Sequence, residues 1–529
     1  MKIFNYRSLI AAAGAAALVT LSLAPLRAAT LTWSAGADIL STDPHAMNDT
    51  FSMTFLNNVY EGLVRHTDQL KIEPALATSW SRISPTVWRF KLRPNVTFQN
   101  GDHFSADDVV FSWQRANTPG GLIMSVINQI KDIRKVDDLT VDIETQKPFP
   151  ILLSVLTYFY MMDKHWAEEN GATASSDLTS NHENFAAVHA NGTGPFKLVS
   201  RDIGVKTILA ANPGWWDKPE HNLSQVTFEP IQSDATRTAA LLSGAIDVTV
   251  SVPVQDIDRI EADPKLQVVQ GPALRTIYFG MDMDRNELLY SDVKGKNPLK
   301  DIRIRRAIYE AIDIEAIKQK VMHGHSWPTG IIMSPYITGY PQGLNTRLPY
   351  DPAESRKLLA EAGYPNGFSV GLTCPNDRYV NDENICLAVV SMLAHVGIKI
   401  IPQIETRAKW IHQVNTLDVS MFMMGHAALP TADAYSTMSE AIATRTENQG
   451  GLNAGRYSNP KFDSLLDQVE QELDPGRRDA LIKEAMTLVR DDIAFIPLHQ
   501  QPVIWAAKKG IDLHQGPDDD LRLWYVVAH

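Results

Sequence analysis

Two histidines two residues apart are the first side chains in this sequence whose types and spacing could carry chemistry. On a strand, His323 and His325 would point to one face and could bind a metal ion together. No third ligand is visible near them in the sequence, so we expect no metal site. The sequence also lacks a G-x-S-x-G nucleophile elbow, an H-E-x-x-H zinc motif and a Walker A loop. We therefore predict a protein that is not an enzyme and uses no cofactor.

Two other short motifs have plain structural interpretations. Residues 192–194, Gly-Thr-Gly, lack the third glycine and the helix of a dinucleotide-binding fingerprint, which predicts a tight turn before a strand. Residues 518–520 are three consecutive aspartates, and we expect them to lie in a solvated loop. Neither motif indicates a catalytic site.

Tryptophans are spread along the chain instead of forming one cluster. Clefts that bind extended ligands are lined with aromatic side chains and a few polar groups, although packing in the core is the alternative for each ring. The rings in question are Trp80, Trp88, Trp113, Trp215, Trp216, Trp327, Trp410, Trp505 and Trp524.

The composition is that of a globular protein. Of the 529 residues, 44% are apolar and 21% are charged, so the chain can bury large cores and is not mainly disordered. The formal net charge of -12 argues against nucleic acid or an anionic membrane as the main partner. Cys374 and Cys386 are the two cysteines, and they form either one disulfide bridge or two buried thiols.

The N-terminus has the pattern of a secretory signal peptide. Lys2 and Arg7 precede an apolar run over residues 9–23, and residues 28–29 are small alanines suited to cleavage. The run is short for a membrane anchor, since a spanning helix needs about 20 apolar residues. We predict that residues 1–29 are a signal peptide, and because no cysteine follows the run we expect no lipoprotein anchor.

Helices and strands alternate along the rest of the chain. Residues 88–93 alternate apolar and basic side chains, as in a half-buried strand, and Ser105 begins a helix with two aspartates in its first turn. Another helix opens at Asp351, an N-cap that is followed by a first-turn proline. Near the C-terminus the pattern predicts two strands, over residues 493–498 and 503–506. The alternation predicts an α/β fold with mixed sheets.

At several points the sequence resembles a known family. Residues 88–98, 100–102 and 105–112 are similar to the signature of extracytoplasmic solute-binding protein family 5, the dipeptide, oligopeptide and nickel receptors of ABC importers. Further similar strings follow in the same order through nearly the whole chain, at residues 74–80, 192–198, 212–216, 241–248, 301–308, 358–364 and 456–463.

The resemblance implies a two-lobe periplasmic-binding-protein fold of type II, in its large subclass with an extra subdomain and a hinged cleft. Lobe I would combine residues 30–63, 190–275 and 499–529, with residues 64–189 inserted as the subdomain. Lobe II would be residues 276–498. The signature around residue 88 is then expected to be scaffold, because its strand alternation and helix cap explain it without a ligand.

The resemblance also implies residues that bind the ligand. In dipeptide receptors of this family an arginine after a lobe II strand binds the ligand carboxylate, and Arg378 follows the strand expected over residues 368–372. The adjacent Tyr379 is included in the candidate ligand-binding set.

The same receptors bind the α-amino group through an aspartate in a Gly-Trp-containing loop. Here Asp433 is the matching acid, but His426 replaces the usual tryptophan and the spacing differs. Tyr435 and Trp410 complete the candidate ligand-binding residues. No catalytic and no metal-binding residue is expected.

The resemblance predicts a periplasmic receptor that captures a di- or oligopeptide-like solute and delivers it to an inner-membrane ABC permease. It is expected to be a monomer and to bind no nucleic acid. The altered loop keeps a second prediction open, in which the same receptor binds a sugar derivative, an opine or a metal chelate. A secreted hydrolase is the remote alternative.

Overall fold

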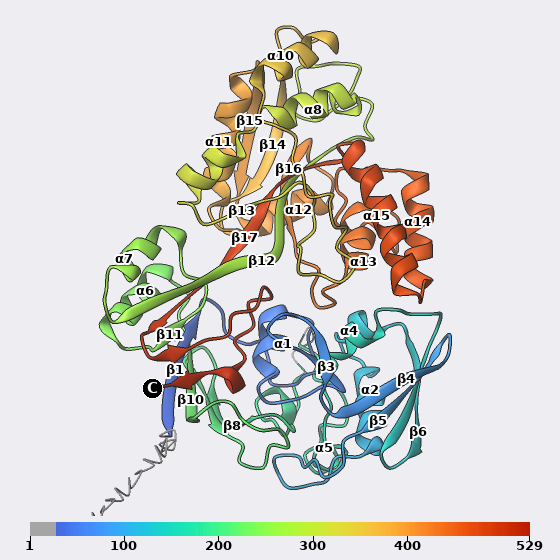
Figure 1. The fold of residues 1–529 in the computed structure, drawn as a ribbon, viewed down its shortest axis with the longest axis vertical. Coiled ribbons are helices and arrows are strands. Elements are labelled where there is room, and N and C mark those ends of the chain that lie inside the picture. Colours follow the sequence, from blue (N-terminus) through green and yellow to red (C-terminus); the bar gives the residue numbers. More distant parts are fainter. Residues whose placement is uncertain (1–27, 179, 181) are drawn as a thin grey trace, which may run out of the picture.

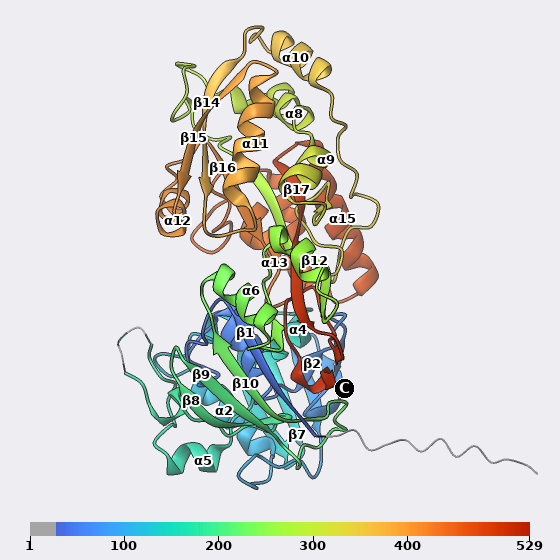
Figure 2. The same cartoon turned by 90° about the vertical axis from the view of Figure 1, so that its left-hand side faces the viewer.

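A computed structural model describes residues 28–178, 180 and 182–529 of the chain. Two lobes lie one above the other, joined by the long strands β12 (Leu266–Met281) and β17 (Phe495–Lys508), as Figures 1 and 2 show. The predicted signal peptide lies outside the described residues except at residues 28–29. In the part of the chain that is described, no helix has the length and apolarity needed to span a bilayer.

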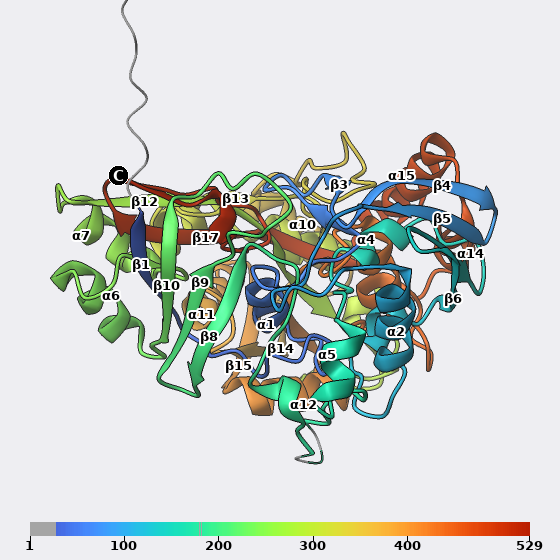
Figure 3. The same ribbon diagram turned by 90° about the horizontal axis from the view of Figure 1, so that it is seen from below.

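Lobe I contains the N-terminal strand and a separate small sheet. Figure 3 shows strands β8–β10 on one side of this lobe and the four-stranded β4-β5-β7-β6 sheet on the other. The strands are β1 (Ala29–Ala35), β2 (Val64–His66), β3 (Ile72–Pro74), β4 (Ala77–Ser84), β5 (Val87–Leu92), β6 (Ile130–Asp137), β7 (Thr140–Thr145), β8 (Phe196–Asp202), β9 (Lys206–Ala211), β10 (Leu223–Pro230), β11 (Val248–Thr249), β18 (Ile511–Asp512) and β19 (Val527–Ala528). The helices are α1 (Thr50–Leu56), α2 (Ala106–Ala116), α3 (Met124–Ile127), α4 (Leu152–Leu156), α5 (Lys164–Glu169), α6 (Asp234–Ser243) and α7 (Ile257–Glu261).

Lobe II packs helices around a parallel and antiparallel sheet. Its strands are β13 (Trp327–Pro328), β14 (Phe368–Pro375), β15 (Ile398–Glu405) and β16 (Met421–His426). Its helices are α8 (Ile302–Glu310), α9 (Ile314–Ala316), α10 (Pro352–Glu361), α11 (Asp382–Ala394), α12 (Arg407–Asn415), α13 (Ala434–Ser436), α14 (Pro460–Gln471) and α15 (Pro475–Asp491), with a π-helical turn at Thr437–Ile442. The α/β class with mixed sheets is confirmed.

One sheet runs through both lobes, in the order β15-β14-β16-β12-β17-β11-β1-β10-β9-β8. The antiparallel β12–β17 ladder shifts register between Pro272 and Thr276, and Pro272 lies opposite Pro502. Proline has no N–H to donate, so the ladder is weakest where the chain passes from one lobe to the other. The predicted lobe boundaries at 275/276 and 498/499 lie close to this point.

The two strands predicted near the C-terminus are one continuous strand, β17. The sequence pattern breaks at residues 499–502, where Pro502 interrupts the apolar alternation. Pairing with β12 resumes on both sides of this stretch, so β17 is one strand although Pro272 faces Pro502 there and the register shifts.

Local capping signals are confirmed. Ser105 and Asp108 form a capping box at the start of α2, in which the side chain of each residue accepts a hydrogen bond from the backbone N–H of the other. Asp351 caps α10 through the N–H groups of residues 353 and 354. Gly244 ends α6 with φ +80°, a left-handed conformation that costs glycine no steric strain.

The predicted turn at residues 192–194 is held by a buried carboxylate. Glu61 accepts hydrogen bonds from the Thr193 hydroxyl at 2.8 Å and from the indole nitrogens of Trp215 and Trp216 at 3.2 and 2.8 Å. A Cβ at Gly192 would lie 2.1 Å from the Val59 carbonyl oxygen, so only glycine fits there. These family-like segments are therefore scaffold, as predicted for the signature region.

Candidate ligand-binding site between the lobes

A cavity of about 710 Å³ lies between the lobes. Lobe I contributes Gln232 and residues 251–253, and β17 contributes residues 501–504 from the strand that joins the lobes. Lobe II contributes residues 376–384, the loop after β14 and the start of α11. The volume lies in the range of roughly 300–1,000 Å³ that is usual for sites of small ligands.

Arg378 and Tyr379 both line this cavity, as the resemblance implied. The Asp382 side chain accepts the backbone N–H groups of both residues at 2.9 Å, which holds the loop against the start of α11. The Arg378 guanidinium lies 5.5 Å from the centre of the Tyr379 ring. Among the described residues, its side chain makes no hydrogen bond or ion pair, so its charge remains available to a ligand.

A disulfide closes the base of the same loop. Cys374 at the end of β14 is bonded to Cys386 in α11, and both residues are fully buried. This decides between the bridge and the two free thiols that the sequence left open. The bridge fixes the two ends of the segment that carries Arg378.

We predict that replacing both cysteines, in a Cys374→Ala/Cys386→Ala variant, lowers the free energy of unfolding by about 2–3 kcal/mol, the scale expected for a loop of this length. Denaturant unfolding of the variant measures the change, and wild-type protein under reducing conditions is the control. An unfolding curve that coincides with that of the oxidised wild type would contradict the prediction.

A second arginine lies beside this loop and was missed in the sequence. Arg275, in the middle of β12, donates to the Gly425 carbonyl oxygen at 3.2 Å and lies 5.8 Å from the Tyr379 ring centre. Burial, and then the charge of Arg378, lowers the pKa of Arg275 to about 10. The only signal in the sequence was a single arginine beside the apolar residues 277–281.

The four other predicted ligand residues lie in lobe II outside the cavity lining, and two of them, Trp410 and His426, are described first. Trp410 is buried, donates its indole N–H to the Met423 carbonyl oxygen at 3.2 Å and packs edge-on against Tyr379. His426 is buried at the end of β16, where burial lowers its pKa to about 4. Trp410 therefore packs against Tyr379 without lining the cavity itself. A direct contact of Trp410 or His426 with the ligand stays a prediction.

Tyr435 takes part in a contact between the lobes. Its hydroxyl donates to Glu470 of α14 at 2.7 Å, and the same carboxylate pairs with Lys147 of lobe I at 2.6 Å. Its ring packs against the hydrophobic cores of both lobes. The residue thus helps to hold the lobes together beside the cleft.

Asp433 is engaged within lobe II. Its two carboxylate oxygens accept hydrogen bonds from Arg478 of α15 at 2.7 and 2.9 Å, and both residues are buried. One of these oxygens also caps α13 by accepting the Tyr435 N–H at 2.8 Å. With both oxygens occupied, Asp433 is not part of the ligand site that we propose.

We predict that Arg478→Met lowers the free energy of unfolding by about 3–5 kcal/mol, because it leaves the Asp433 charge buried without a partner. The matched control is Arg477→Met, since Arg477 forms an exposed pair with Glu472 and should contribute at most about 1 kcal/mol. Equal destabilisation by the two substitutions, measured by denaturant unfolding, would rule out this role for Arg478.

The aspartate run at residues 518–520 was predicted to be solvated, and this is wrong for Asp518 and Asp520 although Asp519 is exposed. Asp518 and Asp520 are buried beside Arg522, whose Nη2 lies 2.6 and 3.5 Å from their carboxylates. The guanidinium compensates both charges, which allows the loop to fold inward. The sequence interpretation overlooked Arg522 as their partner.

Asp519 alone of the three faces the cleft. It lines the interlobe cavity and also a smaller pocket of lobe I that Trp33 and Phe55 line. Its carboxylate accepts the Trp505 indole N–H at 2.6 Å and, among the residues described, has no ion pair. Solvent reaches this side chain through the cleft, but the surrounding protein raises its pKa to about 6.

The other aspartates of the cavity are occupied within their own lobes. Asp234 pairs with Arg237 at 2.6 Å, and Asp377 accepts the backbone N–H of Arg407. Asp382 holds the Arg378 loop, as described above. Arg378 in lobe II and Asp519 in lobe I are therefore opposite charges that the cavity offers to a ligand from its two sides, and Glu383 of lobe II is a further carboxylate of the lining.

His323 and His325 are not part of a cluster of metal-binding side chains in the described residues. His325 hydrogen-bonds the Gln270 side chain at 2.7 Å through its Nδ1 atom. Within residues 28–178, 180 and 182–529, no group of three or more His, Cys, Asp or Glu side chains is placed to hold a metal ion.

Comparison with known proteins gives consistent matches over most of the chain. A family model described as "Bacterial extracellular solute-binding proteins, family 5 Middle" matches residues 71–446. The glutathione-binding protein GsiB of Escherichia coli (strain K12) is 26% identical over 487 residues, which cover 90% of each chain. GsiB of Salmonella paratyphi A is 26% identical over 485 residues with the same coverage.

Solved structures share the fold. HbpA2 from Haemophilus parasuis has a TM-score of 0.81 at 22% identity and covers 95% of this chain and 100% of its own. The periplasmic binding protein DppA from Helicobacter pylori, in complex with the peptide STSA, has a TM-score of 0.73 at 23% identity, with coverage of 95% and 98%. At these identities the structures establish the two-lobe fold.

Proposed function

The chain belongs to family 5 of the bacterial extracellular solute-binding proteins, and we propose that it captures a peptide-like solute between its lobes for an inner-membrane ABC permease. Members of this family bind solutes and do not catalyse reactions. We further propose that residues 1–29 direct export, that the receptor works in the periplasm and that it acts as a monomer.

The pair of opposite charges across the cavity is the observation that carries this proposal. A peptide with free ends has a carboxylate and an ammonium group, which suit Arg378 in lobe II and Asp519 in lobe I. Both groups line one cavity, and neither has an ion-pair partner among the described residues. A ligand that satisfies both charges would contact both lobes.

Such a ligand would couple binding to closure. Contacts to both lobes form only when the lobes are together, so the ligand shifts the population toward the closed arrangement. The cavity volume of about 710 Å³ lies in the range usual for sites of small ligands, so the cavity can hold a short peptide chain.

The two arginines beside Tyr379 support an acidic peptide as the solute. Arg275 and Arg378 both lie within 6 Å of that ring and repel each other, and Arg378 lines the cavity while Arg275 does not, so a ligand carboxylate at Arg378 would offset the repulsion. Glutathione is a tripeptide with two carboxylates, and the relatives compared above are named for binding it. It is therefore the first solute to test.

A non-peptide solute such as an opine is the second candidate. The pairing of Asp433 with Arg478 favours it, because this pairing removes from lobe II the acid that would bind a ligand ammonium. A solved structure with the same fold, AgaA of Agrobacterium tumefaciens, is in complex with agropinic acid. Mass spectrometry of solute released from purified protein distinguishes the two candidates.

We predict that Arg378→Met weakens binding of glutathione or a dipeptide about 30-fold, equivalent to about 2 kcal/mol, because the ligand carboxylate loses its partner. Isothermal titration calorimetry measures the affinity. Arg356→Met in α10, an exposed arginine outside the cavity, is the control and should bind as the wild type does. Unchanged affinity in Arg378→Met would remove Arg378 from the site.

We predict that Asp519→Asn weakens binding of a dipeptide with a free amine at least tenfold but leaves the weaker binding of its N-acetyl form unchanged. In the wild type, affinity for the free-amine peptide should fall about tenfold between pH 7.5 and pH 5, because protonation of a group with a pKa of about 6 removes the charge. The variant should lack this dependence.

Asp518, Trp505 and Arg275 also face Asp519, but Asp518 is held by Arg522 and the other two do not titrate in this range. Asp512→Asn, at an exposed acid of the same C-terminal segment, is the control. An equal loss of affinity for the free and the acetylated peptide would show that Asp519 does not recognise the amine.

A further inference from the structure

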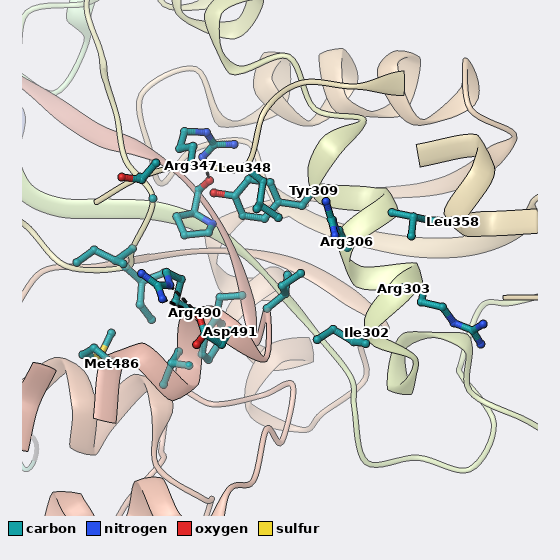
Figure 4. Close-up of a pocket in the computed structure, with 18 residues that line it drawn as sticks. Ile302, Arg303, Arg306, Tyr309, Arg347, Leu348, Leu358, Met486, Arg490 and Asp491 are labelled. Carbon is teal, nitrogen blue, oxygen red and sulfur yellow. Dashed lines mark hydrogen bonds and ion pairs between the residues drawn. The ribbon is translucent and has the colours of Figure 1, made fainter. Parts of the chain in front are cut away.

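A second large cavity lies entirely within lobe II. It has a volume of about 600 Å³ and is formed by α8, α10, α15, residues 330–332 and 346–348 and the start of β17 (Figure 4). None of the residues that line it also lines the interlobe cavity. Solute binding in the cleft therefore does not account for this cavity.

Most of its wall is apolar. Figure 4 shows side chains from α8, α15 and the 346–348 segment converging on the same space. The apolar side chains that form the wall are those of Ile331, Ile332, Leu348, Leu358, Met486 and Val489. An apolar surface of this extent favours an apolar ligand group over water.

Arg347 gives the cavity an uncompensated charge. Its Nη1 atom donates to the carbonyl oxygens of Thr329 and Pro497, and its guanidinium lies 4.8 Å from the centre of the Tyr309 ring. In the described part of the chain no carboxylate comes within ion-pair distance of it. Burial lowers the pKa of Arg347, which is the direction expected for a cation with no neutralising partner.

The other arginines of the lining differ from Arg347 in this respect. Arg303 pairs with Asp301 at 2.6 Å, Arg306 pairs with Glu310 at 2.8 Å, and Arg490 pairs with Asp491 at 2.7 Å. Their charges are already compensated inside the lobe. Arg347 is thus the cation of this cavity that is left for an anionic ligand.

We propose that this cavity binds a small amphipathic anion, in which a single carboxylate lies at Arg347 and an unbranched apolar chain lies against the α8 and α15 side. The guanidinium has donors beyond the one used by the backbone carbonyls, and it presents them to the cavity in a fixed orientation. The apolar chain would cover the wall that is otherwise in contact with water. This site is independent of the solute in the cleft.

Dodecanoate, kept below its micelle concentration, is the probe that tests the site. We expect isothermal titration calorimetry to give one dodecanoate per full chain. This binding should persist with the cleft saturated by peptide and in the Arg378→Met variant. Dodecyltrimethylammonium, with the same chain and the opposite charge, should bind at least tenfold more weakly.

The diagnostic substitution is Ile302→Glu, since Ile302 lines the cavity at its rim, is 44% exposed and can be changed without disturbing the core. It should weaken dodecanoate binding at least tenfold, because it places a charge on the α8 side of the cavity, against which the apolar chain would lie. The matched control is Leu387→Glu on α11, which is 45% exposed in the same lobe but outside the cavity, and it should bind as the wild type does.

Three results would overturn the proposal. They are the absence of dodecanoate binding, its loss in Arg378→Met or under saturating peptide, and binding that Ile302→Glu leaves unchanged. Equal affinity for dodecyltrimethylammonium would overturn the role of Arg347. A peptide affinity that Ile302→Glu leaves at the wild-type value confirms that the variant is folded and that the two sites are separate.

Discussion

The antiparallel pairing of β12 with β17 is the interaction on which the rest of the structure depends. These two strands belong to the sheet of each lobe, so the lobes cannot be placed without them. The ladder lapses where Pro272 faces Pro502, next to Arg275 and to the cavity residues 501–504. The most deformable part of the sheet and the ligand cavity are therefore adjacent, which lets a bound solute act directly on the connection between the lobes.

Charged residues of the scaffold differ from those of the proposed sites in whether an opposite charge lies close to them. Buried charges inside each lobe are paired at close range, as Asp433 is with Arg478 in lobe II and Asp518 is with Arg522 in lobe I. A buried charge without a partner costs stability, so a fold retains one only where something else compensates it. Arg378, Asp519 and Arg347 line cavities and have no ion-pair partner among the described residues, and for that reason we assign them to ligands, whereas the buried Glu61 carboxylate is compensated by three hydrogen bonds inside the scaffold.

The two cavities share a strand. Pro497 of β17 lines the lobe II cavity and accepts a hydrogen bond from Arg347, while residues 501–504 of the same strand line the cleft. A separate contact, from Tyr435 through Glu470 to Lys147, also joins the lobes. The position of β17 thus affects both cavities, although the two cavities have no lining residue in common and different charged residues, Arg347 in one and Arg378 with Asp519 in the other.

The sequence by itself determined what depends on neighbours along the chain. The caps at Ser105 and Asp351, the turn at residues 192–194 and the alternating elements follow from local geometry and hydrogen bonding, and the ordered family strings indicated the two lobes and Arg378. Only the tertiary structure decided which charges are free. Asp433 is paired with Arg478, 45 residues further along the chain, whereas Arg378 has no ion-pair partner among the described residues. Asp519 faces the cleft because its neighbours Asp518 and Asp520 are buried beside Arg522. Spacing along the chain carries no information on such contacts, because a charge is compensated by whatever the fold places within a few ångströms of it.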